Sequence, residues 1–160
     1  MRQHLPTLIL VVLLAASIAA FCGPEPAKAA HHTTHHESAA LRAYRDGQAA
    51  RRCHQLGAPR GLCRYLVAGT HLVHAPRRWA YSTDLLHIIK RESSYNPCAV
   101  NPTHTDCSYT GSHACGWFQL NPCRCYPNRI AQVHCGLLYI KNRYTTPRRA
   151  WQHELAYGWY

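Results

Sequence analysis

A single glutamate, Glu92, ends an apolar stripe whose spacing is that of a helix. The stripe repeats at i, i+3, i+4 and i+7 through Leu85, Ile88, Ile89 and Glu92. Burial of a lone carboxyl group disfavours its charged form and therefore raises its pKa. A carboxyl group that stays protonated near neutral pH can act as a general acid. The pattern makes Glu92 a candidate catalytic acid, and the alternative is an ion pair with Arg91 or a distant arginine.

Four sequence segments follow in an order that gives Glu92 a context. They are ESSYNPCAVN at 92–101, ACGWFQLNP at 114–122 and, near the end of the chain, YIKNRY and AWQHELAYGWY. Together they resemble the transglycosylase SLT domain of the lysozyme-like superfamily, and in particular its actinobacterial and phage-associated members, over roughly residues 79–160. In that family a glutamate lies in an E-S-x-x-N-P-x-A-x-N context, and a G-x-x-Q-x-x-P element lines the glycan cleft. The resemblance implies a lysozyme-like fold and action on peptidoglycan.

The resemblance assigns roles to five residues. It implies that Glu92 is the catalytic acid and that the adjacent Ser93 supports the site by hydrogen bonding. It implies that Gly116 and Gln119 belong to the cleft element, with Trp117 in a usually apolar position between them. Physically, a glycine lets backbone approach a sugar closely, and a glutamine amide can hydrogen-bond an acetamido group. The alternatives are a solvated loop position for the glutamine and core packing for the tryptophan.

The closing segment departs from the family's usual A-Y-N-A-G pattern, because Trp151 stands where tyrosine is usual. Four aromatic residues are therefore candidates for the floor of the cleft, namely Tyr139, Tyr144, Trp151 and Tyr157. Their alternative role is packing in the core.

The number of carboxyl groups separates two reactions. Hydrolysis of a glycosidic bond normally uses two, and only Asp106 and Glu154 follow Glu92 in the chain. Asp106 is the candidate partner, although it also suits an ordinary polar turn. The resembled family works with one glutamate, which cleaves the bond between N-acetylmuramic acid and N-acetylglucosamine and leaves a 1,6-anhydro ring. We therefore expect a lytic transglycosylase acting through Glu92 on peptidoglycan glycan strands. The alternatives are a hydrolytic muramidase that uses Asp106, and a non-catalytic cationic wall-binding or antibacterial protein.

The elements that position this site are expected to be mainly α. A helix should begin at Ser82 or Thr83 and end before Pro97. A second helix should run from about 128 to 143, and a third should open at Pro147. The segment between the first two reads as a loop or small hairpin. The predicted fold class is therefore a mainly α, lysozyme-like domain with a small loop or hairpin region, stapled by disulfides.

Eight cysteines remain once a leader is removed, and an even number in a small exported domain indicates a disulfide framework. They are Cys53, Cys63, Cys98, Cys107, Cys115, Cys123, Cys125 and Cys135. A bridge from Cys53 to Cys63 would close the region before residue 76 upon itself, and the other pairings stay open. Zinc is the alternative, but no CxxC pair faces another across a zinc-finger interval. We expect no metal and no cofactor.

The start of the chain has the pattern of an export signal. The run from Leu8 to Phe21 contains nothing more polar than Ser17 and is too short for a membrane span. We expect cleavage after Ala29, and the alternatives are an uncleaved anchor or lipid attachment at Cys22. The prediction is a secreted protein of the cell wall that meets a membrane only through its leader.

The predicted organisation has four parts. They are a signal peptide at 1–29, a histidine-rich disordered spacer at 30–38, an N-terminal helical or loop extension at 39–75 and the lysozyme-like domain at 76–160. The histidine tract has metal binding as its alternative role. Cleavage leaves 16 basic and 6 acidic residues, a formal net charge of +10 that suits anionic wall polymers. The chain has no recognised nucleic-acid-binding module, so we expect no nucleic acid partner, and we expect a monomer.

Overall fold

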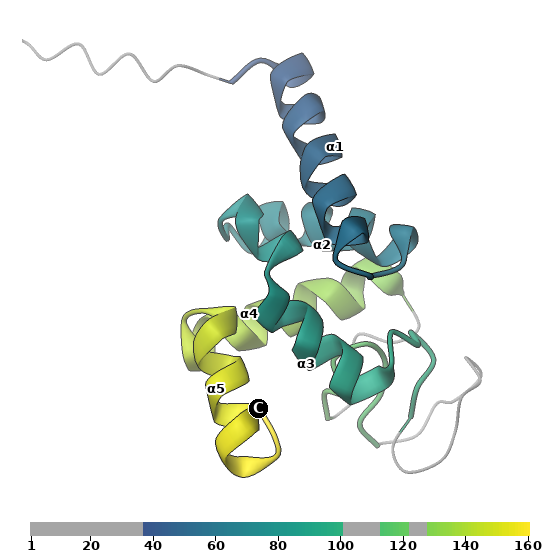
Figure 1. Cartoon of the computed structure of the whole chain (residues 1–160), viewed down its shortest axis with the longest axis vertical. Helices are drawn as coiled ribbons and strands as arrows, with labels where there is room; N and C mark the ends of the chain where they lie inside the picture. Colours follow the sequence, from purple (N-terminus) through teal and green to yellow (C-terminus); the bar gives the residue numbers. More distant parts are fainter. Residues whose placement is uncertain (1–36, 101–112, 122–127) are drawn as a thin grey trace, which may run out of the picture. The chain divides into compact units, whose positions relative to one another are not determined.

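Five α-helices and one 3-10 helix carry most of the residues that the structure describes, which are 37–100, 113–121 and 128–160. In this computed structural model (Figure 1) the elements are α1 (Ala39–Gln55), α2 (Arg60–Leu72), η1 (Arg77–Tyr81), α3 (Thr83–Ser93), α4 (Arg129–Tyr144) and α5 (Pro147–Tyr157). The mainly α class predicted from the sequence is confirmed. The predicted leader and most of the histidine-rich spacer lie outside the described residues.

The three helices predicted after residue 76 begin at the expected positions, each directly after a capping residue. The Ser82 hydroxyl accepts a hydrogen bond from the Leu85 amide, and the Asn128 side chain accepts from the first-turn amides of α4. The Thr146 hydroxyl accepts from the Arg149 amide, with proline at the first position of α5. Each cap satisfies amide groups that the helix itself leaves without partners. These starts are therefore confirmed together with the three helices.

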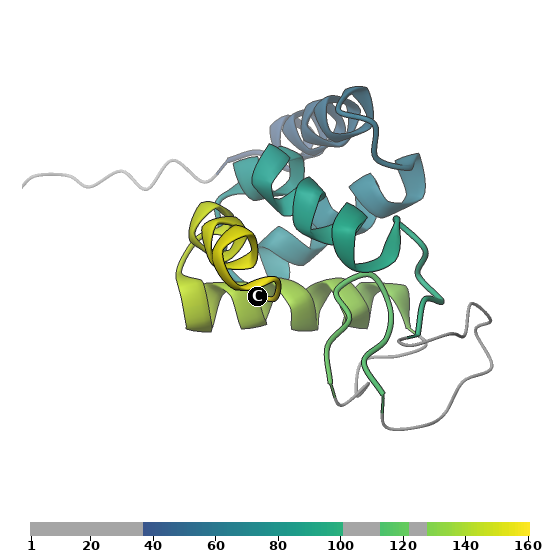
Figure 2. The ribbon, with the colours of Figure 1, turned by 60° about the horizontal axis from the view of Figure 1, so that its bottom comes forward.

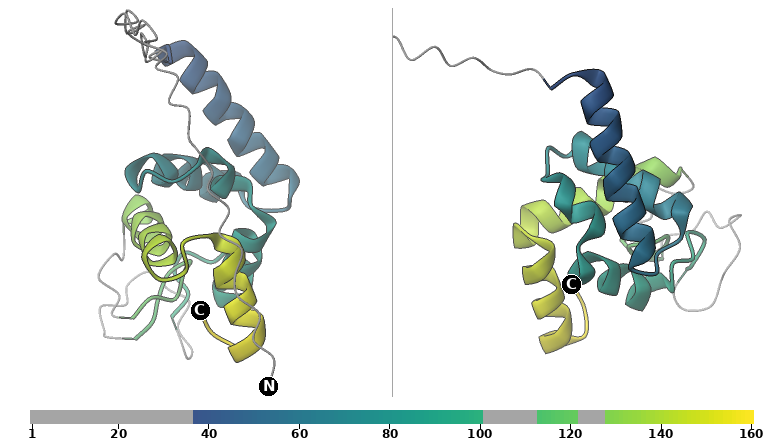
Figure 3. Two further views of the ribbon diagram at one scale, coloured as in Figure 1. Left: turned by 90° about the vertical axis from the view of Figure 1, so that its left-hand side faces the viewer. Right: turned by 45° about the horizontal axis from the view of Figure 1, so that its top comes forward.

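The segment 39–75 forms two helices joined by a disulfide. Cys53 near the end of α1 is bonded to Cys63 in the first turn of α2. Pro59 stands immediately before α2, where its fixed φ of −59° suits a helix start. The bridge predicted from Cys53 to Cys63 is confirmed. The N-terminal part of α1 extends beyond the other helices (Figure 3), and its residues there are exposed.

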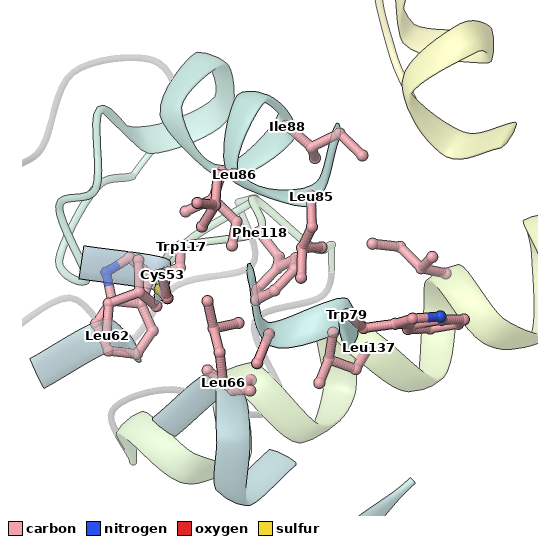
Figure 4. Close-up of a cluster of buried hydrophobic side chains, with 14 of the residues drawn as sticks. Cys53, Leu62, Leu66, Trp79, Leu85, Leu86, Ile88, Trp117, Phe118 and Leu137 are labelled. Carbon is pink, nitrogen blue, oxygen red and sulfur yellow. The ribbon is translucent and has the colours of Figure 1, made fainter. Parts of the chain in front are cut away.

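One hydrophobic core joins this helical pair to the rest of the described chain (Figure 4). It includes Leu62 and Leu66 of α2, Leu85 of α3 and Leu137 of α4. The crossing of α2 and α4 is close, because a Cβ added at Gly69 would overlap the side chain of Val133 in α4. Helix α4 contacts both α2 and α5 (Figure 2). The core therefore continues across residue 76 without a division.

A second close approach brings the segment before α4 onto that helix. A Cβ added at Gly136 would overlap the ring of Phe118, which is 2% exposed. Among the described residues, β-structure consists of two isolated antiparallel bridges, from Cys115 to Val100 and to Leu120. The hairpin predicted for this region lies largely outside the described residues. Phe118 is thus held between α4 and the core, and it fixes the segment in which the sequence predicts a cleft element.

The remaining described cysteines, Cys98, Cys115 and Cys135, are also disulfide-bonded. The other three predicted framework cysteines, Cys107, Cys123 and Cys125, lie outside the described residues, as does Asp106. None of the helices in the described ranges has the length and apolar character needed to cross a membrane.

Candidate active site

Glu92 lies in the last turn of α3, where the buried face of that helix meets solvent. Leu85, Ile88 and Ile89 on the same stripe are completely buried, whereas Glu92 is partly exposed. The chain then leaves the helix through Ser94 and Tyr95, whose φ values are both positive, at 53° and 65°. Two consecutive left-handed residues turn the backbone sharply away from the helix axis. Glu92 is therefore anchored by a buried helix while its carboxyl group stays accessible.

A second carboxyl group, that of Glu154 on α5, lies against the end of α3. Glu154 is 1% exposed, and both of its carboxyl oxygens are buried. Arg91 forms an ion pair with it, with Nε 2.6 Å from Oε1, although half of the Arg91 side chain is exposed. Helices α3 and α5 are neighbours (Figure 1), and because Arg91 directly precedes Glu92 in the chain, this ion pair joins α5 to the last turn of α3.

The surroundings raise the pKa of Glu92 from 4.5 to about 7. Burial is the largest cause, because it disfavours the charged carboxylate. The negative charge of Glu154 raises the pKa further, whereas the positive charge of Arg91 lowers it. A carboxyl group with this pKa is about half protonated at neutral pH, and it can both donate and accept a proton. The structure thus gives Glu92 the protonation behaviour that the apolar stripe predicted.

Tyr160 is a further member of the site that the sequence did not single out. Its buried hydroxyl donates a hydrogen bond to the Phe118 carbonyl oxygen at 2.6 Å. Burial holds its pKa well above the ordinary value, and the charges of Glu92 and Glu154 raise it too. Tyr139 donates to the main-chain oxygen of Tyr160 at 3.2 Å. Tyr160 therefore stays neutral, and its hydroxyl anchors the backbone of the predicted cleft element at Phe118. Its position in the segment G-W-Y, at 158–160, was the available signal in the sequence.

Gly116 takes a conformation that its surroundings require. Its φ is +75°, and an added Cβ would lie 2.6 Å from Oε1 of Gln132. The same Oε1 accepts a hydrogen bond from the Trp117 amide at 3.1 Å, and Gln132 Nε2 donates to the Pro97 carbonyl at 3.0 Å. The buried Gln132 of α4 therefore joins the turn after α3 to the predicted cleft element. The space above Gly116 holds this side chain, and contact of Gly116 with a sugar stays a prediction.

Trp117 and Gln119 are also held by hydrogen bonds within the chain. Trp117 is 4% exposed, and its indole Nε1 donates to the Tyr95 carbonyl at 2.9 Å. Gln119 Nε2 donates to the Ala99 and Gly116 carbonyls at 2.9 and 2.8 Å. These bonds occupy the amide nitrogen of Gln119 and leave its Oε1 as the atom that could accept a bond from an acetamido N–H. The predicted cleft element is thus fixed against the turn that follows Glu92.

Three other predicted site residues, Ser93, Tyr144 and Trp151, lie on α3, α4 and α5. The Ser93 hydroxyl is buried and donates to the Ile89 carbonyl one turn earlier, at 2.9 Å. The ring of Tyr144 is buried, and burial raises the pKa of its hydroxyl. Trp151 is half-buried, with its ring centroid 5.2 Å from that of His87 on α3. Direct substrate contacts of these three residues stay predictions.

The described part of the chain has no group of three or more His, Cys, Asp or Glu side chains arranged to hold a metal ion. Comparisons with models of protein families, with curated proteins and with solved structures found no match to this chain.

Proposed function

We propose that this chain is a peptidoglycan lytic transglycosylase in which Glu92 is both general acid and general base. The observation that carries the proposal is a partly exposed carboxyl group at the end of a fully buried helical stripe, with a pKa raised to about 7. The motif resemblance around Glu92 and Gln119 supports the same assignment. A lysozyme-like fold is part of the proposal, as are secretion and location in the cell wall.

The proposed reaction needs one proton-transfer group. Protonated Glu92 donates its proton to the oxygen that links N-acetylmuramic acid to N-acetylglucosamine, and the bond from that oxygen to C1 breaks. The substrate's own acetamido group stabilises the positive charge that develops at C1. Ionised Glu92 then removes the proton of the muramyl 6-hydroxyl as its oxygen bonds to C1, which forms the 1,6-anhydro ring. Glu92 ends the cycle protonated, and no water is consumed.

The burial of Glu154 supports the transglycosylase over a hydrolase built on these two acids. A second carboxylate that activates water or attacks C1 must reach the sugar. Glu154 is 1% exposed and ion-paired with Arg91, so a glycan strand cannot reach its carboxyl group. Its charge instead favours the protonated form of Glu92. Asp106, the other candidate for the second carboxyl group, lies outside the described residues. The product analysis below distinguishes a hydrolase that uses Asp106 from the transglycosylase.

Mass spectrometry of digested peptidoglycan tests the proposal. We expect fragments that end in 1,6-anhydromuramic acid, and Glu92→Gln should abolish them while circular dichroism shows an unchanged fold. Ordinary reducing ends would contradict the transglycosylase and favour a muramidase, which Asp106→Asn should then inactivate. Undiminished lysis by folded Glu92→Gln would refute both enzymes and leave a cationic wall-binding protein.

A further inference from the structure

A groove of about 860 Å³ lies between α1 and α2, apart from the site around Glu92. Its lining residues lie between positions 46 and 55 of α1 and between positions 60 and 71 of α2. None of these residues belongs to the candidate active site. The proposed reaction at Glu92 therefore accounts neither for the groove nor for the helical pair that forms it.

Three arginines give the groove an excess of positive charge. Arg51 comes from one wall, and Arg60 and Arg64, one helical turn apart, come from the other. An added Cβ at Gly47 would lie 3.5 Å from Nη1 of Arg51, so this guanidinium folds back over the glycine that lines the groove. No described residue forms an ion pair with any of the three arginines. Their charges are available to a ligand placed between the two helices.

The single acid in the lining, Asp46, is already neutralised. Its carboxylate accepts a hydrogen bond from Nε of Arg77 at 2.5 Å and lies 3.0 Å from Nε2 of His71. Asp46 therefore does not offset the three arginines. The groove attracts anions, and a guanidinium is well suited to phosphate because its planar set of N–H groups can bind two oxygens at once.

Four residues of the remaining lining are small or aliphatic, which restricts the kind of anion. Gly47 and Ala50 of α1 face Val67 and Ala68 of α2, and no Phe, Tyr or Trp lines the groove. Single-stranded nucleic acids are usually bound by stacking their bases on aromatic side chains. The rings in this lining are those of His54 and His71, which are held by hydrogen bonds to the Ala58 carbonyl and the Asp46 carboxylate. Its volume also exceeds what one inorganic phosphate fills. An extended polyanion with an aliphatic backbone and repeated phosphates matches both the charge and the shape.

We propose that the α1–α2 groove binds a phosphodiester-linked polyol or sugar polymer of the cell wall through Arg51, Arg60 and Arg64. The helical pair at 39–72 is then a wall-anchoring element built onto the catalytic core. This site does not depend on the reaction at Glu92, and Glu92→Gln should bind the polymer as well as the unchanged chain.

Fluorescence anisotropy with labelled poly(glycerol phosphate), at fixed ionic strength, tests the proposal. The groove variant is Arg51→Glu with Arg64→Glu, and the control is Arg78→Glu with Arg148→Glu. All four arginines are exposed, and both variants change the net charge equally. Because one charge-assisted hydrogen bond is worth about tenfold in affinity, the groove variant should bind at least about tenfold more weakly than the control.

Three results would overturn the proposal. Equal losses in the two variants would mean that binding reflects net charge and not the groove. Tighter groove-dependent binding of single-stranded DNA of matched charge would make the groove a nucleic-acid site. Tighter groove-dependent binding of anionic lipid vesicles would make it a membrane site. Circular dichroism and thermal melts of both variants show whether a loss of binding comes from unfolding.

Discussion

Replacing Glu154 by glutamine tests how the structure sets the protonation of Glu92. The substitution keeps the size and shape of the side chain but removes the negative charge that raises the pKa of Glu92. It also frees Arg91 from its ion pair, and the charge of Arg91 lowers the same pKa. Both changes act in one direction, so the pKa of Glu92 must fall. Half of the Arg91 side chain is exposed, so water can solvate it and the variant should fold.

The expected size of the fall in the Glu92 pKa depends on how large a part of the upward shift Glu154 causes. The pKa of Glu92 is raised from 4.5 to about 7, and burial, which the substitution leaves in place, is the largest cause. Glu92 is partly exposed, which weakens its interaction with a neighbouring charge, so we expect the pKa to fall by about one unit. At pH 7 the protonated fraction then drops from about one half to about one tenth. The rate at pH 7 should fall by about fivefold, whereas at pH 5 the two proteins should differ little.

Two measurements check this expectation. The pH dependence of kcat/KM on soluble peptidoglycan should show its upper limb shifted to lower pH, and 13C NMR should show the Glu92 carboxyl titrating lower whether or not the enzyme is active. The control is Asp84→Asn, which removes an acid from the first turn of the same helix, about 12 Å away along its axis. An unchanged or higher Glu92 pKa in Glu154→Gln would refute the reasoning, as would an equal shift in the control.

Three further predictions concern stability. Since the pKa of Glu92 rises on folding, its stabilising contribution is complete below pH 4.5 and is lost as the pH rises through about 7. Glu92→Gln should therefore raise the free energy of unfolding at pH 8 by about 1–2 kcal/mol, a value reduced to allow for the partial exposure of Glu92, and should hardly change it at pH 4. Equal gains at both pH values in thermal melts would contradict this prediction. Gly136→Ala should cost about 2–3 kcal/mol in urea unfolding because its Cβ meets an aromatic ring, whereas Gly61→Ala, with open space around it, should gain about 0.5–1 kcal/mol. Replacing both Cys53 and Cys63 by alanine opens a loop with a sequence separation of 10 and should cost about 2–3 kcal/mol, seen as a lower Tm.

Local signals explain why the sequence predicted the helices that carry the site. The Ser82 cap, the apolar stripe to Glu92 and the proline at the start of α5 each act within a few residues of the chain. Contacts between residues far apart in the chain could not be predicted from such local signals. Gly116 is a glycine because Gln132, sixteen positions later, fills the space above it, and no local pattern encodes that contact. The inclusion of α1 and α2 in one core likewise depends on the crossing at Gly69.

The burial of Glu154 shows where polarity fails as a guide and why the failure is informative. Pro147, Ala150 and Glu154 form the buried stripe of α5, while the adjacent Leu155 is 61% exposed. A helix that follows polarity would place these last two side chains the other way round, because burying a carboxylate is costly even when it is paired. Sequences are usually consistent between local pattern and fold, and departures tend to occur at functional sites. The cost of burying Glu154 is understandable if its charge is needed to keep Glu92 protonated.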